Sequence, residues 1–222
     1  FTSMKNYLIG SSLLLSSLVA LPVLAEDDYY FTIGAGVAYT SDVEYDYTTS
    51  GTTYDITEET DNPAVFSVGI GKSFENDYRV ELNYSKATVS TDSFTVSSGG
   101  SGVAGSITPA LEYDVSSYML YGYKDFPGDS KFTPYAGLGA GIAIFDADDQ
   151  IATIAGTAYS FTFDSETVLS YALKGGVAYE ASDRATVFTE ATYQNFTEYT
   201  TASVSYDSNS TFAISAGLRF SF

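Results

Sequence analysis

The chain has 222 residues, with 9 Lys and Arg against 28 Asp and Glu, and it contains no His, Cys or Trp. Without His and Cys it lacks the commonest general base, thiol nucleophiles, thiolate zinc sites and disulfides. A formal net charge of -19 has the wrong sign for binding a phosphate backbone, so we expect no nucleic-acid partner. Its 20 Tyr, 15 Phe and 19 Gly favour an all-β chain.

The first 25 residues have the pattern of a signal peptide. Residues 1–3 are interpreted as an upstream leftover, and a short basic start leads into an apolar, serine-dotted stretch over 8–24. The abrupt acidic junction after Ala25 fits signal-peptidase cleavage there. A membrane-anchor helix is the alternative, and Pro22 together with the acidic flank argues against it. We therefore expect a single exported domain over 26–222.

From Tyr29 to Thr40 the sequence alternates with a period of two, apolar at odd positions and mostly small or polar at even ones. Such a strand fits lipid on one face and a polar lumen on the other. Similar segments recur along the chain, each roughly 12 to 15 residues long, which is enough for a tilted membrane strand. The eight expected strands are 29–40, 63–74, 78–89, 112–126, 132–145, 166–180, 184–196 and 209–222.

Short and long connections alternate between these segments. The connections at 75–77, 127–131 and 181–183 are tight turns, whereas the others are rich in Ser, Thr, Gly and Asp and cover 43–62, 90–111, 146–165 and 197–208. This asymmetry is typical of outer-membrane barrels. The pattern predicts an all-β, eight-stranded antiparallel up-and-down transmembrane β-barrel with four long extracellular loops and short periplasmic turns. A soluble β-sandwich is the alternative.

Aromatic residues are expected to form two belts at the membrane interfaces. The belt near the short turns contains Tyr29, Phe31, Phe74, Tyr78, Phe126, Phe132, Tyr179, Phe220 and Phe222. The belt toward the long loops contains Tyr39, Tyr84, Phe145, Tyr171, Tyr193 and Phe212. A general preference of aromatics for strands explains their number but not this two-level arrangement.

Three stretches of the chain resemble small outer-membrane barrels of the OmpA/OmpX and opacity-type surface-antigen superfamily. They are Phe132–Gly141 (FTPYAGLGAG), Tyr171–Tyr179 (YALKGGVAY) and the closing Ala216–Phe222 (AGLRFSF). The resemblance implies a location in the outer membrane of a Gram-negative-type bacterium and a surface-antigen role. It also implies that Phe220 and Phe222 form the signal read by the barrel-assembly machinery. Outer-membrane lipid and lipopolysaccharide are the other expected envelope partners, and we expect a monomer.

A symmetric register about each short turn predicts which residues share a face. About 75–77 it opposes Phe74 with Tyr78, Ile70 with Leu82 and Val68 with Tyr84, all outward. About 181–183 it opposes Tyr179 with Ala185, Val177 with Val187 and Leu173 with Ala191, and it places Lys174 opposite Glu190 in the lumen. In 112–126 we favour Tyr118 and Leu120 outward, although Met119, Tyr121 and Tyr123 are also compatible with the pattern.

Inward charges define a lumen network of Arg79, Glu81, Lys174, Glu190 and Arg219. An eight-stranded barrel is just wide enough inside for side chains, so these charges are expected to form an ion-pair plug. A catalytic pair of Glu81 and Glu190 is disfavoured because no substrate cleft is evident and because each carboxylate is expected to have basic side chains beside it. With no His available either, we expect neither an enzyme nor a cofactor.

The four long connections carry 13 Asp and Glu and no Lys or Arg. Residues expected to take part in recognition are Glu44, Asp46, Asp55, Glu58, Glu59, Asp61, Asp146, Asp148 and Asp149. The Asp146–Asp149 run lacks the Gly and the terminal Glu of an EF-hand, so weak divalent binding is the most it supports. Solvation by charge is the simpler interpretation. Residues 97–106 have the composition of a flexible linker.

The predicted function is a closed barrel scaffold that displays acidic loops for adhesion, recognition or envelope integrity. The external partner would be a protein, a phage or a cell-surface ligand. The alternative is a narrow transporter or small pore, as in barrels that resemble OmpW, and the inner glycines Gly137, Gly139 and Gly141 give it slight support.

Overall fold

The computed structural model describes residues 28–49, 52–98, 101–154, 157–161, 165–201 and 204–222. The predicted signal peptide over 1–25 lies outside the described residues. The long strands are β1 (Tyr29–Thr40), β4 (Ala64–Phe74), β5 (Tyr78–Ser98), β6 (Ser101–Asp125), β7 (Phe132–Asp146), β10 (Glu166–Ser182), β11 (Ala185–Phe196) and β14 (Asn209–Ser221). The shorter elements are β2 (Val43–Thr49), β3 (Thr52–Thr60), the 3-10 turn η1 (Glu75–Asp77), β8 (Gln150–Ile154), β9 (Thr157–Phe161), β12 (Tyr199–Thr201) and β13 (Val204–Tyr206).

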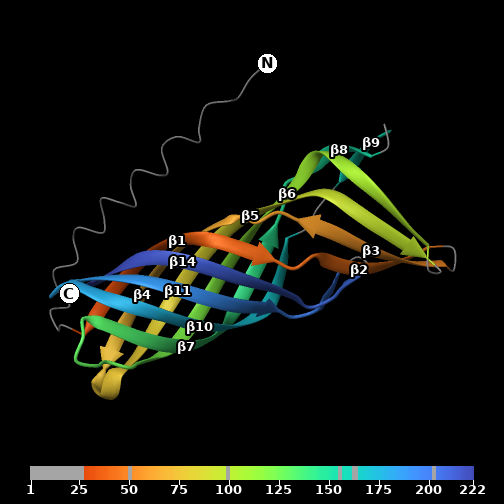
Figure 1. The fold of residues 1–222 in the computed structure, drawn as a ribbon. Helices are drawn as coiled ribbons and strands as arrows, with labels where there is room; N and C mark the ends of the chain where they lie inside the picture. The colour runs from red at the N-terminus through yellow and green to blue at the C-terminus, as the bar shows by residue number, and fades with distance from the viewer. Residues whose placement is uncertain (1–27, 50–51, 99–100, 155–156, 162–164, 202–203) are drawn as a thin grey trace, which may run out of the picture.

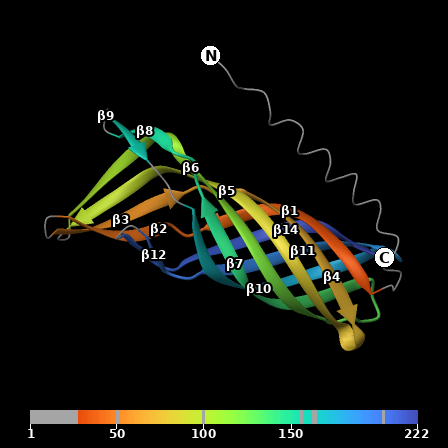
Figure 2. The same ribbon diagram turned by 180° about the vertical axis from the view of Figure 1, so that it is seen from behind.

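The eight long strands close into a ring. They pair antiparallel in the order β5-β4-β1-β14-β11-β10-β7-β6, and β5 pairs with β6 to complete the circle. Figures 1 and 2 show the resulting barrel from opposite sides, with the C-terminus at the end that carries the short turns. The predicted eight-stranded up-and-down barrel is confirmed. Among the residues the structure describes, no helix is long and apolar enough to span a membrane.

The long connections differ from the predicted loops, because much of their length is strand. Strand β5 runs to Ser98 rather than to 89, and β6 begins at Ser101 rather than at 112. The linker interpretation of 97–106 is therefore wrong for 97–98 and 101–106, and 99–100 lie outside the described residues. The other three connections contain the pairs β2–β3, β8–β9 and β12–β13. Their Thr, Tyr, Val and Ile residues suit pleated strands, and pairing with a neighbour supplies hydrogen bonds that an irregular loop would lack. Figure 1 shows these extensions projecting beyond one end of the barrel.

The β4–β5 hairpin has the predicted register. Phe74 pairs with Tyr78, Ile70 with Leu82 and Val68 with Tyr84. Its turn places Asn76 and Asp77 at positive φ of 62° and 63°, a conformation that Asn and Asp tolerate better than most residues. The phase of β6 is confirmed as well, because Tyr118 and Leu120 are exposed to the outside whereas Met119, Tyr121 and Tyr123 are buried.

The predicted register of the β10–β11 hairpin is wrong by two residues. Tyr179 pairs with Val187 rather than Ala185, and Val177 pairs with Thr189. The turn lies at 183–184 rather than at 181–183, because β10 runs to Ser182 and Ser182 pairs with Ala185. An irregularity between Glu180 and Ser182 then moves the register by one residue in the opposite sense, which leaves a net difference of two. Because side chains alternate with a period of two, a shift of two residues leaves every side chain on its predicted face.

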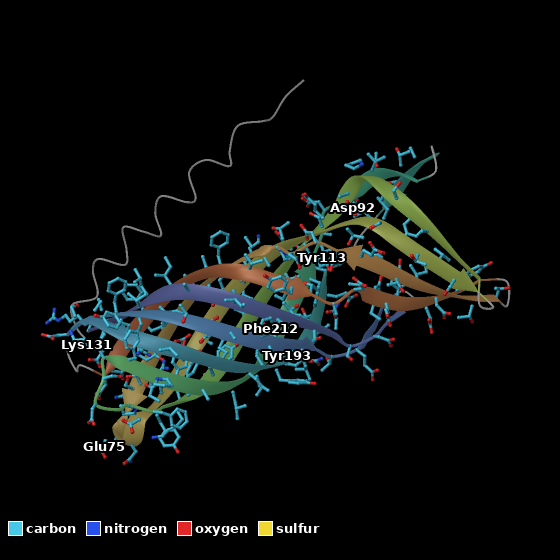
Figure 3. All side chains as sticks on the ribbon, viewed as in Figure 1. Glu75, Asp92, Tyr113, Lys131, Tyr193 and Phe212 are labelled. Carbon is cyan, nitrogen blue, oxygen red and sulfur yellow. The ribbon has the colours of Figure 1, made fainter. Side chains whose placement is uncertain are left out.

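Aromatic rings meet across neighbouring strands at both ends of the apolar band. Near the short turns Phe31 stacks on Phe220 with 4.9 Å between ring centroids, and Phe132 lies 5.0 Å from Tyr179. Figure 3 shows Glu75 and Lys131 at this end, and the paired Tyr193 and Phe212 farther along the outside of the barrel. The outward face between the belts is apolar and includes Ile33, Val68, Ile70, Leu82, Leu120, Leu138 and Leu173.

The belt assignment of Phe145 is wrong. Strand β7 points Tyr135 and Ala143 into the barrel, so the period of two turns Phe145 inward as well. There it packs against a buried cluster that contains Val168 and Phe196. Phe66 and Tyr118, which the predicted belts omitted, are exposed on the outside.

Candidate functional site

The lumen contains a layer of charge near the short-turn end, centred on Arg79 at the start of β5. The guanidinium makes two parallel contacts to Asp125 at the end of β6: Nε donates to Oδ2 at 2.7 Å and Nη2 donates to Oδ1 at 2.9 Å. Nη1 donates to the Tyr30 hydroxyl at 3.2 Å, and the guanidinium lies 4.4 Å from the ring centroid of Tyr123. With only 5% of Arg79 exposed, this bidentate pair is enclosed by aromatic rings.

A second layer lies deeper in the barrel and joins β10 to β11. The Lys174 ammonium is 2.7 Å from Glu190 Oε1, and the two side chains are 9% and 7% exposed. The Tyr135 hydroxyl donates to Glu190 Oε2 at 3.1 Å. The ammonium also lies 4.3 Å from the ring centroid of Tyr121. Although Lys174 pairs with Thr192 along the strand, its long side chain reaches Glu190 diagonally.

The structure brings together only part of the lumen charge network expected from sequence. Arg79 pairs with Asp125, which the sequence analysis did not name, and not with Glu81. Glu81 accepts a hydrogen bond from Asn83 Nδ2 at 3.0 Å. In the part of the chain that the structure describes, Glu81 and Arg219 form no ion pair, and the Arg219 guanidinium lies 5.6 Å from the ring centroid of Tyr30. The alternation in 112–126 places Asp125 on the same face as Tyr123, so the signal for this residue was present.

Large rings cover Gly137 and Gly139 of β7, whereas Gly141 packs against the backbone of Tyr118 and Met119. A Cβ atom on Gly137 would collide with the ring of Tyr123, and one on Gly139 would collide with the ring of Tyr121. These glycines therefore make room for tyrosines on the neighbouring strand β6. Tyr121 and Tyr123 are 2% and 4% exposed and stack on each other at 5.7 Å between centroids. The glycines that gave slight support to a pore are thus part of a filled lumen.

A cavity of about 90 Å³ remains on the extracellular side of the Lys174–Glu190 pair. Small side chains from β1, β4 and β14 leave this space, among them Ala38, Ser67 and Ala213. A smaller cavity of about 20 Å³ lies between the two charged layers. The lumen is thus packed toward the short turns and hollow toward the long hairpins.

The β2–β3 hairpin carries most of the predicted recognition carboxylates. Asp46 lies directly opposite Asp55, and partial desolvation together with the repulsion of Asp55 raises the pKa of Asp46 above its ordinary value. Glu58 is half-buried and accepts a hydrogen bond from the Tyr45 hydroxyl at 2.8 Å. Burial raises the pKa of this carboxyl. Glu58 therefore supports the hairpin, whereas Asp46, Asp55 and the neighbouring Glu44 are exposed.

The remaining predicted recognition carboxylates lie near the barrel rim. Glu59 accepts a hydrogen bond from the Ser93 hydroxyl at 3.1 Å, and Asp61 accepts one from the Ser90 amide at 2.9 Å. Asp146 ends β7 opposite Asp114, and Asp148 and Asp149 follow it in the chain. Within the described residues no three acidic groups are arranged to hold a metal ion. These carboxylates form an acidic rim with no preformed metal centre in the described part of the chain.

Sequence and structure comparisons place this barrel among known proteins. A profile described as "Outer membrane protein beta-barrel domain" matches residues 11–220, and no curated protein sequence matches the chain significantly. Neisserial surface protein A is 15% identical, with a TM-score of 0.57 over 87% of this chain and 97% of that chain. OprG from Pseudomonas aeruginosa is 14% identical, with a TM-score of 0.49 over 88% and 95%.

The attachment invasion locus protein Ail of Yersinia pestis, solved in complex with the heparin analogue sucrose octasulfate, is also similar. It is 18% identical, with a TM-score of 0.40 over 87% of this chain and 99% of that chain. At such identities these likenesses concern the fold alone. The match to the family profile covers nearly the whole barrel. The chain is thus a member of the outer membrane protein β-barrel domain family and resides in the outer membrane of a Gram-negative bacterium.

Proposed function

We propose that this protein is a non-enzymatic surface-recognition scaffold, in which a plugged barrel holds acidic β-hairpins outside the cell. The observation that carries the proposal is the contrast between the two ends of the molecule. Two buried charge pairs and stacked tyrosines fill the lumen toward the short turns. Toward the other end, β5 and β6 extend the barrel wall, and the neighbouring β2–β3 hairpin carries most of the predicted recognition carboxylates. Segments mounted on a rigid scaffold commonly carry recognition.

The charge of the hairpins defines the class of partner. The four long connections contain 13 Asp and Glu without a single Lys or Arg. They repel other anionic surfaces and attract cationic proteins, or surfaces bridged to them by divalent ions. Attraction of this kind weakens with salt, because the Debye length is about 8 Å at physiological ionic strength. The exposed carboxylates Glu44, Asp46 and Asp55 are best placed for such contacts, whereas Glu58 is committed to Tyr45.

The second candidate is a narrow transporter, and the cavity in the extracellular half of the lumen is the observation that favours it. A solute leaving this cavity toward the periplasm would have to pass the Lys174–Glu190 pair and then Arg79 with Asp125. Separating a buried ion pair, so that one charge loses its partner, costs about 3–5 kcal/mol. That cost opposes a static open path. Single-channel conductance of purified protein distinguishes the two functions.

The test shortens connections 43–62 and 146–165 to tight turns, separately and together. Shortening should leave a barrel that still runs faster unboiled than boiled on a denaturing gel, and it should reduce binding to cells, phage or extracellular matrix. A full-length control in which Glu44, Asp46 and Asp55 become amides separates loss of charge from loss of surface. Unaltered binding together with altered solute flux would favour the transporter.

The same proposal includes the export of the protein and its assembly in the outer membrane. Residues 1–25 are cleaved as a signal peptide, and 26–222 form one domain. The barrel-assembly machinery reads Phe220 and Phe222, and the Phe222 amide donates to the Tyr29 carbonyl at 2.9 Å. The mature protein is a monomer surrounded by outer-membrane lipid and lipopolysaccharide.

A further inference from the structure

We propose that the cavity in the extracellular half of the lumen is a binding site for a primary alkylammonium ion. This site lies inside the barrel, so it is spatially separate from the recognition surface of the hairpins. Its floor is the Lys174–Glu190 pair, and it extends to the extracellular ends of β1 and β14, where Thr40 and Asn209 line it.

The cavity presents hydrogen-bond acceptors. Gln194 crosses the lumen from β11, and its Nε2 donates to Ser117 Oγ on β6 at 3.1 Å and to Ser170 Oγ on β10 at 2.9 Å. Both amide hydrogens are therefore used, and the carbonyl oxygen is left to accept. Asn83 likewise donates from Nδ2 to Glu81 Oε1 at 3.0 Å, which fixes its carbonyl oxygen as an acceptor. Since Gln194 and Asn83 both line the cavity, a ligand head that carries N–H donors fits them.

Three aromatic rings surround the same cavity above these acceptors. Phe145 lies 5.3 Å from Phe196 and 6.2 Å from Tyr113, measured between ring centroids, and all three residues line the cavity. The faces of such rings attract cations, and their carbon surfaces accommodate an alkyl chain. A ligand that combines an ammonium head with a short apolar tail matches both features.

The electrostatics exclude an anion and favour a cation. In the sequence the four long connections carry 13 Asp and Glu and no Lys or Arg, and Glu59, Asp61 and Asp146 lie among the described residues near the barrel rim. The one cation on the cavity floor, Lys174, is neutralised by Glu190 at 2.7 Å. A carboxylate or phosphate entering the cavity would therefore meet a repulsive rim and no unpaired positive charge among its lining residues.

The volume limits the size of the ligand. At about 90 Å³ the cavity is smaller than an engineered cavity of about 150 Å³ that binds benzene. A short unbranched chain fits better than a ring or a branched head. We therefore choose n-butylammonium as the probe, with n-butanol as its neutral analogue, butyrate as its anionic analogue and tetramethylammonium as a cation without N–H donors.

The experiment measures one-to-one binding by isothermal titration calorimetry on the full chain in detergent micelles, at physiological ionic strength. We expect n-butylammonium to bind at least tenfold more tightly than n-butanol or tetramethylammonium, and butyrate not to bind. Equal binding of the alcohol and the amine, or no binding of the amine, would overturn the proposal.

Two variants locate the site. Gln194→Met removes the acceptor at similar volume, and Ala213→Phe fills the cavity; each should weaken binding at least tenfold. Ile214→Phe, on the adjacent outward-facing position of β14, is the matched control and should bind as the wild type does. Heat-modifiable gel mobility identifies the folded variants. If the folded Gln194→Met and Ala213→Phe proteins both bind the amine normally, the amine binds to the hairpins and the proposal is wrong.

Discussion

Replacing Lys174 by Met tests whether the buried ion pair acts as a unit. The side chains of Lys174 and Glu190 are 9% and 7% exposed, and Lys174 Nζ lies 2.7 Å from Glu190 Oε1. Removing the ammonium therefore leaves a carboxylate with little access to water. Stranding one charge of a buried pair costs about 3–5 kcal/mol. Glu190 keeps its hydrogen bond from Tyr135, which places the expected cost of Lys174→Met toward the lower end of that range.

The double variant Lys174→Met, Glu190→Met should cost less than Lys174→Met alone. It buries no unpaired charge, and its main penalty is the Tyr135 hydroxyl that loses its acceptor, about 1–3 kcal/mol. Lys86→Met is the matched control, because its ion pair with Asp114 is solvent-exposed at 47% and 37% and should contribute only about 0–1 kcal/mol.

The assay is urea unfolding in lipid vesicles, followed by far-ultraviolet circular dichroism and by gel mobility of unboiled samples. Circular dichroism is preferred because the chain has no Trp. If the loss of unfolding free energy in the double variant equals the sum of the losses in Lys174→Met and Glu190→Met, Lys174 and Glu190 are energetically independent. In that case the description of the lumen as a plug held by this pair is refuted.

Three further outcomes are expected. Gly139→Ala should destabilise the barrel by about 1–3 kcal/mol in the same assay, because its Cβ would collide with the Tyr121 ring. Gly175→Ala, which meets open space on the outside, should be close to neutral. Deleting Phe222 should lower the amount of barrel in outer-membrane fractions at constant synthesis, and an unchanged yield would contradict its proposed assembly role. The pKa of Asp46 is raised in the folded hairpin, so the folded hairpin binds a proton at this carboxyl more tightly than the unfolded chain does. Protection of hairpin amides from hydrogen exchange should therefore increase as the pH falls from 7 toward 4. The increase should be smaller in Asp46→Asn.

Local chemistry determined the eight strands of the barrel and, apart from Phe145, the faces predicted for their residues. Alternation with a period of two depends only on neighbouring residues, and it correctly predicted β1 from Tyr29 to Thr40 and the outward phase of Tyr118 and Leu120. The same rule applied strictly along β7 would have turned Phe145 inward. Short turns between apolar runs were equally visible, since Glu75–Asp77 offers residues that accept positive φ.

The extracellular hairpins were underestimated because composition is a weak guide to strand formation. Segments rich in Ser, Thr and Gly have the composition of loops. When a partner strand is available, pairing with it satisfies the hydrogen-bonding groups of their backbone. Phe94 illustrates the point, because its ring lies over Gly105 on β6, and a Cβ on that glycine would collide with it.

The sequence by itself determined which side chains enter the lumen, and the tertiary structure decided which of them meet. Alternation along each strand assigns Arg79, Asp125, Lys174 and Glu190 to the inside of the barrel. It does not determine the height of these side chains along the barrel axis. That height depends on strand tilt, on the closure of the ring and on the irregularity at Glu180, none of which is a local property. The register of the β5–β6 hairpin brings Arg79 to Asp125, and only the closed barrel leaves a cavity above Lys174.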